Sequence, residues 1–333
     1  MYLGFWGTMK FGVLQFFSWP GRRGDLKEIY DRGLERARIM DQNGYDAVWI
    51  AEHHFSTYSV CPSIHIMGTH FAANTRNLRI GTGVSLASFY NPLRLAEEVA
   101  LLDVLSGGRV NWGAGSGFDP TEFRAFGIDR EQRHARFREN VDIVLAAWNS
   151  DKLTYHGEFH TFEDIEVLPK PLQDPMPVWM AASSLEAIRW SAEKGFSIMM
   201  DPHSSIEDIA TKRQLYDKTL VEHGHDPEGR DIPVARLLAI APTDELARRV
   251  AESGAQWTTG SYAKKSLSLR KQESESDPVQ RYVNDVILWG SPERVADLLL
   301  EYEEEKQLNY LLCAPLSQLS FQLFNDEVLP RLS

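Results

Sequence analysis

The segment NPLRLAEEVALLDVLSGGRVNWGAG (residues 91–115) contains both kinds of element from which the expected fold is built. Asn91 is a favourable helix N-cap, and Pro92 suits the first helical position because the N–H that it lacks has no partner there. A helix is therefore predicted from Pro92 to Leu105. The run Val110–Ala114 that follows is mostly apolar without alternation, which is typical of a parallel strand covered on both faces.

The same alternation of strand and helix repeats along the chain. Strands are predicted at Phe11–Gln15, Ala47–Ala51, Leu78–Val84, Val110–Ala114, Pro177–Ala182, Ser197–Met200, Pro233–Ile240 and Asn309–Cys313. Helices are predicted at Leu26–Asn43, Ile64–Asn74, Pro92–Leu105, Arg130–Trp148, Ser184–Lys194, Ile206–His223, Asp244–Gly254 and Pro292–Lys306. Eight such units predict an α/β fold, the (β/α)₈ TIM barrel, which needs about 250 residues.

Two segments interrupt the alternation. Leu153–Glu166 is predicted to form a short hairpin inserted before the fifth strand. Thr258–Gln280 is long and polar, and it is predicted to be a mobile loop, or lid, before the last strand. The sequence MKFGVLQF reads as an opening strand, so a single domain is expected over residues 9–333, with residues 1–8 as an N-terminal extension.

The composition narrows the class of function. Hydrophobic residues make up 43% of the 333 residues and charged residues 25%, which is ordinary for a soluble enzyme. A net charge of −12 without a basic cluster argues against nucleic acid as a partner. No apolar run approaches the roughly 20 residues that span a bilayer, so no membrane association is expected. The two cysteines fit a reducing, cytoplasmic location.

A doubly wound nucleotide-binding sheet is the main rival fold, because of WGAGSG at 112–117. The dinucleotide fingerprint G-x-G-x-x-G opens a helix. Here the glycines stand at 113, 115 and 117, and Phe118, Asp119 and Pro120 occupy the place where a helix should begin. The sequence therefore favours the barrel.

Three titratable residues, Glu52, His53 and His54, follow the predicted strand Ala47–Ala51. In a barrel, the C-terminal ends of the strands build the active site. Successive side chains point to opposite faces, so the two histidines should diverge, and a shared metal is not expected. One histidine would then be available for proton transfer near neutral pH. A pair of hydrogen-bonded structural histidines is an equally weighted alternative.

Further candidates lie near other strand ends. GTGVSL (81–86) and GAGSG (113–117) would allow a flat ligand to approach the backbone, or merely form bulges. Ser183 and Ser184 precede a helix, whose N-terminus would suit a phosphate or simply be capped. An apolar substrate pocket, or ordinary core, would be formed by the aromatic residues Phe16, Trp19, Phe55, Tyr58, Phe89, Tyr90 and Trp179.

Taken in order, these motifs resemble a known family. GYDAVWIAEHHFSTYS (44–59) resembles the segment around the catalytic histidine of bacterial luciferase and of its flavin-dependent monooxygenase relatives. The resemblance continues through LRIGTGV (78–84), the segment 90–117, EFRAFG (122–127), MAASSLEAIRWSAEKG (180–195) and GSPERVADLL (290–299). It covers nearly the whole chain from Met9, and these motifs are specific in combination.

The resemblance implies a barrel that binds FMN, with reduced FMN delivered by a separate flavin reductase. The reduced flavin reacts with O₂ to a peroxyflavin, which oxygenates a small organic substrate. His53 matches the catalytic acid/base, and Glu52 would be its neighbouring partner. Gly83-Val84 matches a cis peptide against the flavin ring. Ser183 and Ser184 match residues that hold the phosphate, and a homodimer is expected.

Two matched cofactor-binding positions depart from luciferase. Gly115 stands where luciferase has a reactive cysteine, and Ser116 stands where it has an arginine that helps to neutralise the phosphate. The phosphate charge would then be balanced by helix N–H groups, or by Arg133 or Arg136 if these reach it.

Three functions are open at this point. The first is a reduced-FMN-dependent monooxygenase. The second is an oxidoreductase that transfers hydride with a 5-deazaflavin, and the third is a flavin-binding protein without catalysis. His53 argues against the third function, because a silent relative needs no acid/base there. The substrate is not specified, since it is set by loops at the barrel mouth.

Overall fold

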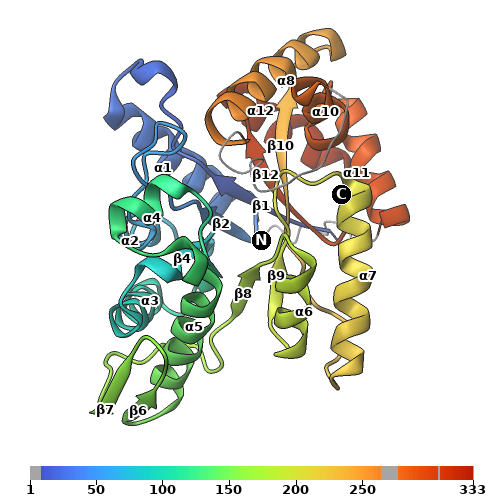
Figure 1. Cartoon of the computed structure of the whole chain (residues 1–333). Helices are drawn as coiled ribbons and strands as arrows, with labels where there is room; N and C mark the ends of the chain where they lie inside the picture. The colour runs from blue at the N-terminus through green and yellow to red at the C-terminus, as the bar shows by residue number, and fades with distance from the viewer. Residues whose placement is uncertain (1–8, 264–276, 307, 333) are drawn as a thin grey trace. The chain divides into compact units, whose positions relative to one another are not determined.

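The computed structural model describes residues 9–263, 277–306 and 308–332. These residues form two compact units (Figure 1). Unit 2 comprises Gln15–Asp41 and Ala47–Ala181, and unit 1 comprises the rest of the described chain. Each unit has its own parallel strands and its own covering helices.

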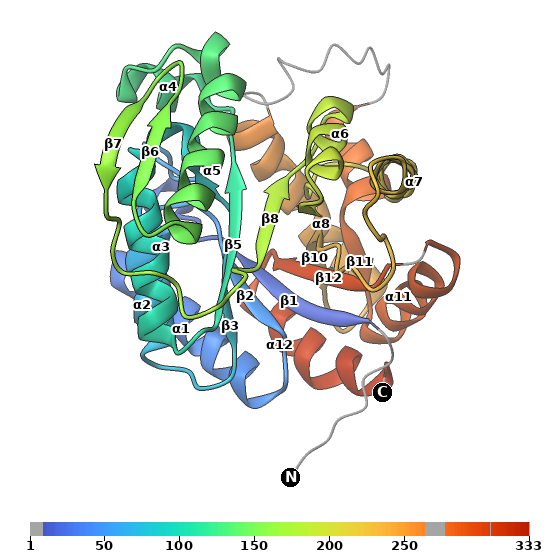
Figure 2. The ribbon, with the colours of Figure 1, turned by 90° about the horizontal axis from the view of Figure 1, so that it is seen from below.

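Unit 2 is a parallel sheet with helices packed along it. Its strands are β2 (Ala47–Ile50), β3 (Arg79–Thr82), β4 (Ser85–Leu86), β5 (Val110–Gly115), β6 (Leu153–His156), β7 (Thr161–Ile165) and β8 (Val178–Ala181). Its helices are α1 (Leu26–Gln42), α2 (Ile64–Ala72), α3 (Pro92–Ser106), α4 (Pro120–Phe126) and α5 (Arg133–Asn149), with short turns η1 (Pro20–Arg22), η2 (Ala87–Phe89) and η3 (Arg130–Gln132). The order β2-β3-β5-β8 is parallel throughout. Helices α2, α3 and α5 pack side by side in that order (Figure 2).

Helix α3 forms as the sequence predicts. The Asn91 side chain accepts hydrogen bonds from the N–H groups of Leu93 and Arg94, which otherwise have no partner in the first turn. The helix ends at Gly107, which has a φ of 73°, a left-handed conformation that glycine adopts without steric cost. Its apolar face is buried, and β5 follows with every residue buried.

The predicted hairpin insertion is confirmed, because β6 and β7 pair antiparallel. Its turn is held by Glu139 of α5, whose carboxylate accepts hydrogen bonds from the N–H groups of residues 158, 159 and 160 at 2.7–3.1 Å. A Cβ on Gly157 would overlap that carboxylate, so glycine is required there.

Unit 1 holds the remaining strands, β1 (Lys10–Gln15, whose last residue lies in unit 2), β9 (Ser197–Met199), β10 (Val234–Ile240), β11 (Leu288–Gly290) and β12 (Tyr310–Pro315). The order β11-β10-β12-β1 is parallel. Its helices are α6 (Leu185–Glu193), α7 (Ile206–Glu222), α8 (Asp244–Thr258), α10 (Pro278–Arg281), α11 (Pro292–Lys306) and α12 (Gln318–Leu323). Shorter turns are η4 (Thr259–Ala263), η5 (Tyr282–Val286), η6 (Phe324–Val328) and η7 (Leu329–Arg331).

Parallel strands alternating with helices in both units confirm the predicted α/β class. The sequence pattern missed β4, β11, α4, α10 and α12, which are too short to show a full hydrophobic period. The expectation that no helix begins near Pro120 is wrong. Asp119 caps α4 there by accepting the N–H of Thr121 at 2.8 Å, and the proline occupies the first turn.

The predicted loop Thr258–Gln280 is helical at both described ends, since α8 runs to Thr258, η4 covers Thr259–Ala263 and α10 starts at Pro278. The mobile loop predicted between them falls on residues 264–276, which lie outside the described residues, as does the predicted extension at residues 1–8.

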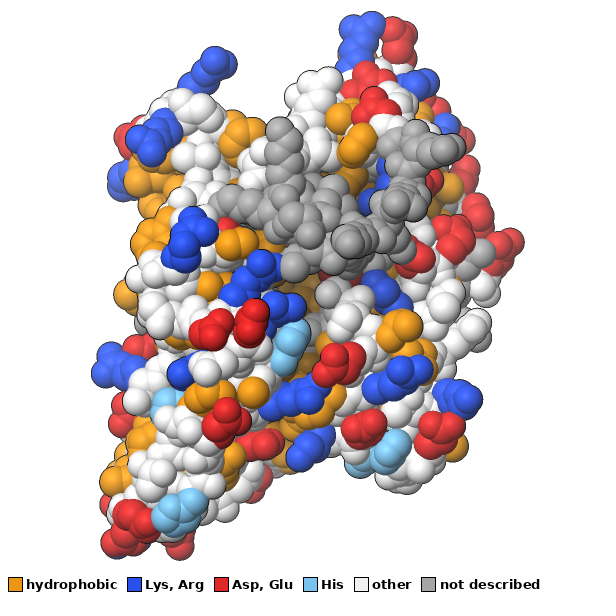
Figure 3. All heavy atoms as spheres, viewed as in Figure 1, with side chains coloured by type: hydrophobic (Ala, Val, Ile, Leu, Met, Phe, Trp, Pro, Cys, Tyr) orange, Lys and Arg blue, Asp and Glu red, His pale blue; other side chains and the backbone are white. Residues whose placement is uncertain are grey.

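On the face seen in Figure 3, acidic and basic side chains both lie among apolar ones. Among the described residues, no helix is both long and apolar enough to cross a membrane.

Candidate functional site

The Glu52–His54 segment leaves β2 directly and is held by two backbone hydrogen bonds. The N–H of His53 donates to the carbonyl of Cys61 at 3.2 Å. The N–H of His54 donates to Glu122 Oε1 at 3.0 Å. The backbone at the strand end is therefore fixed by a neighbouring loop and by helix α4.

Glu52 is a buried acceptor that joins this segment to β4. Its Oε1 accepts the Tyr90 hydroxyl at 2.9 Å and lies 2.9 Å from His54 Nε2, and its Oε2 accepts the N–H of Leu86 at 3.0 Å. Burial, together with the neighbouring Glu52, raises the pKa of the Tyr90 hydroxyl well above its usual range. Both oxygens of Glu52 are thus engaged in holding the fold around His54.

The His53 ring lies in an aromatic cluster. Phe16 stacks on it with ring centroids 6.1 Å apart, and Tyr58 meets it edge-on at 5.1 Å, with Phe118 at 6.4 Å. Its side chain is 13% exposed, and its Nδ1 lies 4.0 Å from Glu122 Oε1. The imidazole is largely packed, with a carboxyl group close to one ring nitrogen.

The His54 ring has different neighbours. Besides Glu52, it contacts Phe126 with centroids 4.9 Å apart and Phe55 at 5.8 Å. The predicted divergence of the two histidines is therefore confirmed. His54 has the hydrogen-bonded surroundings of a structural histidine.

Glu122 is a further candidate residue that the sequence pattern did not identify. It is buried, and its Oε2 has no hydrogen-bond partner. Burial, reinforced by the charges of Asp119 and Glu52, raises its pKa to about 7, although the N–H of His54 acts in the opposite direction. The only signal in the sequence is its position in EFRAFG, three residues after the cap Asp119, where a glutamate ordinarily completes a capping box.

The backbone predicted to contact the flavin lies at two strand ends: Gly83 and Val84 lie between β3 and β4, and Gly115 is the last residue of β5. The Gly83-Val84 peptide is cis, as the resemblance implied. A Cβ on Gly115 would lie 2.6 Å from Val84 Cγ2 and 3.4 Å from the Cβ of Ala181. Gly115 is therefore required by the packing of Val84 against β5. Ser116 is half-buried, and its Oγ lies 3.5 Å from the Gly117 carbonyl, the limit of a hydrogen bond.

The predicted pocket aromatics divide into separate groups. Phe16 and Tyr58 contact His53. Phe55 and Phe89 pack on Phe126, on the His54 side.

Two of the other aromatics lie elsewhere. The Trp19 indole donates to the Gly24 carbonyl at 3.4 Å, within a loop. Trp179 is buried edge-on against Trp49 and belongs to the core. Phe118, which completes the cluster at His53, was missed because it follows no strand pattern.

In unit 1, Ser184 caps α6 by accepting the N–H of Ala187 at 3.2 Å, and Ser183 is exposed. The side chain of Ser184 thus has the capping role, and the helix end that it marks keeps the partial positive charge that favours an anion.

The basic residues considered for the phosphate lie in unit 2. Arg136 donates to Gln132 at 3.2 Å and lies over the Phe159 ring at 4.3 Å, so its guanidinium is already engaged. Arg130 differs, because its Nε and Nη2 are buried with no hydrogen-bond partner. Buried guanidinium donors without a partner require an acceptor, and the sequence pattern did not single out this residue.

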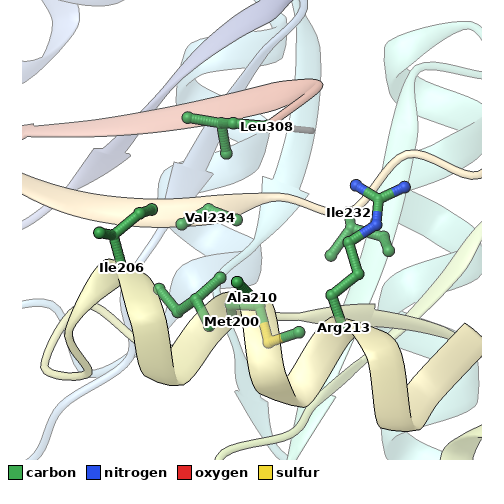
Figure 4. A pocket seen from close by; sticks show the side chains of 8 residues that line it. Met200, Ile206, Ala210, Arg213, Ile232, Val234 and Leu308 are labelled. Atoms are coloured by element: carbon green, nitrogen blue, oxygen red, sulfur yellow. The ribbon is translucent and has the colours of Figure 1, made fainter. Parts of the chain in front are cut away.

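A small cavity in unit 1 lies beside α7 (Figure 4). It is lined by Met200, Ile206, Ile209, Ala210, Arg213, Ile232, Val234 and Leu308, and its volume is about 10 Å³. Such a space holds roughly one water molecule. It is therefore a packing gap in the layer between sheet and helix, not a substrate site.

Comparison with known proteins identifies the family of the chain. Residues 9–306 match the family model described as luciferase-like monooxygenase. The oxygenase component of a flavin-dependent trigonelline monooxygenase from Acinetobacter baylyi is 28% identical, over 72% of this chain and 67% of that protein.

Two solved structures share the fold. The oxygenating constituent of 3,6-diketocamphane monooxygenase from Pseudomonas putida, in complex with FMN, is 21% identical with a TM-score of 0.80, covering 97% of this chain and 98% of that one. The F420-dependent tetrahydromethanopterin reductase from Methanopyrus kandleri is 16% identical with a TM-score of 0.75, covering 98% and 99%. These likenesses confirm the predicted fold class. The chain belongs to the luciferase-like monooxygenase family.

Proposed function

We propose that this protein is a flavin-dependent monooxygenase that uses reduced FMN and O₂ to oxygenate a small organic molecule. The observation that carries the proposal is the His53 imidazole, packed among aromatic rings with a carboxyl group 4.0 Å from Nδ1. Reduced FMN, when bound, supplies the two electrons with which one atom of O₂ enters the substrate while the other leaves as water.

Features of both units are compatible with FMN. In unit 2, the Val84 side chain packs against the backbone of Gly115. We propose that a flat ring system binds to the apolar surface at these two residues. Arg130 carries buried donors that need an acceptor, which suits a phosphate or another anion. In unit 1, the start of α6 at Ser183 and Ser184 is a second candidate for the phosphate. We assign the flavin ring to Gly83, Val84 and Gly115, and we name Arg130 and the start of α6 as alternative candidates for the phosphate.

His53 would hold and move the proton that the reaction needs. An imidazole accepts and donates protons near neutral pH, and general acid/base catalysis of this kind typically contributes about 10²–10⁴-fold. Glu52 fixes the strand end through His54, Tyr90 and Leu86 rather than taking part in proton transfer itself. The aromatic rings around His53 exclude water from the imidazole and offer an apolar surface to an organic substrate.

The name of the trigonelline enzyme, an oxygenase component, supports a separate flavin reductase as the source of reduced FMN. We further propose that the protein is a cytoplasmic homodimer. Size-exclusion chromatography with light scattering would test the oligomeric state.

A second candidate function is hydride transfer with a 5-deazaflavin, which the fold shared with the F420-dependent reductase favours. The two are separated by one experiment. The protein is supplied with FMN kept reduced by an added reductase, and with a panel of ketones, aldehydes and aromatic compounds under ¹⁸O₂.

One ¹⁸O atom in the product supports the monooxygenase. In a second arm, reduced 5-deazaflavin replaces FMN, and product that forms only there and carries no ¹⁸O would support the second function instead. Binding of either cofactor without product from any compound would favour a flavin-binding protein without catalysis.

A further inference from the structure

Glu122 is a buried acid that the proposed chemistry has not yet used. It lies in the first turn of α4, and its Oε1 accepts the N–H of His54 at 3.0 Å. The same oxygen lies 4.0 Å from His53 Nδ1, and Oε2 is buried with no hydrogen-bond partner. One carboxyl group thus holds the backbone of the histidine segment and approaches the ring of the catalytic candidate.

A structural explanation for Glu122 would be a capping box, in which a glutamate at this position returns to the N–H of the cap residue. Here the carboxyl group reaches across to the segment after β2 instead. A purely structural acceptor would also satisfy both of its oxygens, as Glu139 comes closer to doing: its Oε1 and Oε2 each accept two backbone N–H groups. The partnerless Oε2 of Glu122 therefore needs another explanation.

The surroundings favour a proton on this carboxyl group. Glu122 faces Glu52 and Asp119 as acids, and His53 and His54 as possible cations. Burial and the two nearby acids disfavour a negative charge, and the N–H of His54 favours it. A carboxyl group whose pKa is raised to about 7 keeps its O–H in part of the molecules at neutral pH, and this O–H can be donated to a base.

We propose that Glu122 is a positioning residue that shares one proton with His53 and so sets the pH at which the imidazole carries it. As His53 Nε2 gives its proton to the reacting group, the proton on Glu122 moves to Nδ1. The imidazole stays neutral and the carboxyl group becomes a carboxylate, and the reverse transfer restores both. A modest ring rotation or one bridging water closes the 4.0 Å separation.

Two groups that interact so closely titrate as a pair. The pair carries two protons at low pH, one shared proton in the intermediate range and none at high pH. The His53 ring should therefore titrate in two steps, and its upper step should lie above the value of a histidine beside a neutral amide. This statement concerns the protein alone, whereas the role in turnover rests on the proposed function.

The test is a titration of ¹⁵N-histidine-labelled protein by NMR, with His53 assigned from the His53→Gln spectrum. In the wild type, two inflections are expected for His53. In Glu122→Gln, one inflection is expected, with the upper step lowered by at least about half a pH unit. Glu139→Gln is the matched control, since it removes a buried, backbone-bound carboxylate of the same unit and should leave the His53 curve unchanged.

Identical His53 curves in wild type and Glu122→Gln would overturn the proposal. Should Glu122→Gln not fold, Glu122→Asp replaces it. Retracting the acid by one methylene should weaken the coupling and lower the upper step, and an unchanged curve again overturns the proposal. The titration needs neither flavin nor substrate, so its result does not depend on the oxygenation assay. A failure of the titration likewise does not affect the proposed monooxygenase function.

A second readout follows if the protein oxygenates a substrate. The pH profile of single-turnover product formation should shift in Glu122→Gln in the same direction as the His53 titration. A uniform loss of rate with an unmoved profile would show that Glu122 only supports the fold.

Discussion

The Nε2 of His54 lies 2.9 Å from Oε1 of Glu52, and this contact occupies the second of the two adjacent histidines. It ties the residue after a catalytic candidate to a carboxylate that also holds Tyr90 and the backbone of β4. One of the two adjacent histidines therefore helps to fix the strand end.

His54→Ala is expected to destabilise the fold more than it slows the chemical step. It removes one of the three hydrogen-bond partners of the buried Glu52 and the packing of the ring on Phe126, which together contribute about 1–3 kcal/mol. The free energy of unfolding, measured by urea denaturation, should fall by this amount. Product formation per folded molecule should stay within about threefold of the wild type. An unchanged unfolding free energy would contradict the structural role.

His53→Ala is expected to lose about 10²–10⁴-fold in single-turnover product formation with supplied reduced FMN. Its affinity for FMN should fall far less, because the groups assigned to the phosphate lie elsewhere in the chain. Near-normal product from His53→Ala, combined with a tenfold or larger loss from His54→Ala (about 1.4 kcal/mol), would assign the chemistry to the other histidine.

Glu122 should make the stability of the protein depend on pH. Its pKa is raised to about 7 in the folded state, whereas an unfolded glutamate titrates near 4.3. Between these values the folded state holds a proton that the unfolded state has lost, so this contribution to stability is complete below the unfolded pKa and is lost as the pH rises to about 7.

The expected loss is up to about 4 kcal/mol, at about 1.4 kcal/mol per pKa unit. In Glu122→Gln this part of the pH dependence should disappear. Urea denaturation of both proteins at several pH values between 4.5 and 8 measures the difference, and parallel curves would show that Glu122 is ionised throughout.

Gly115→Ala should be destabilising by about 1–3 kcal/mol, the usual cost of overpacking. The new Cβ would lie 2.6 Å from Val84 Cγ2, so Val84 must move. Gly260→Ala is the control, because its Cβ would meet nothing within 4 Å. Thermal unfolding of both variants, with FMN titration by fluorescence, would separate packing from binding. Equal stability of the two variants would mean that Val84 moves aside without lowering the free energy of unfolding.

Ser184→Ala should lower the unfolding free energy by about 1 kcal/mol through loss of the α6 cap. Ser205→Ala removes the equivalent cap of α7 and should cost a similar amount. If the start of α6 holds the FMN phosphate, only Ser184→Ala should also weaken FMN binding. Equal FMN affinity in the two variants would move the phosphate away from this helix end.

The sequence alone was sufficient for the α/β class, the hairpin insertion and the main elements. Each of the long helices carries several turns of apolar periodicity, and each main strand is a nearly continuous apolar run, so local pattern and burial agree. The cap at Asn91 and the divergence of His53 from His54 also follow from local geometry, because caps and the alternation of side chains depend only on near neighbours in the chain.

The partners of those residues were decided only by the tertiary structure. Glu122 lies 69 positions from His53 in the sequence, and its position after Asp119 predicts a capping box, yet its carboxyl group meets the histidine segment. Glu52 was expected to be the partner of the neighbouring His53, but its carboxyl group bonds to His54, Tyr90 and Leu86. Burial then changes the pKa of groups such as Glu122, because the free energy of a charge depends on the water and the other charges around it. The order of residues in the sequence shows neither of these.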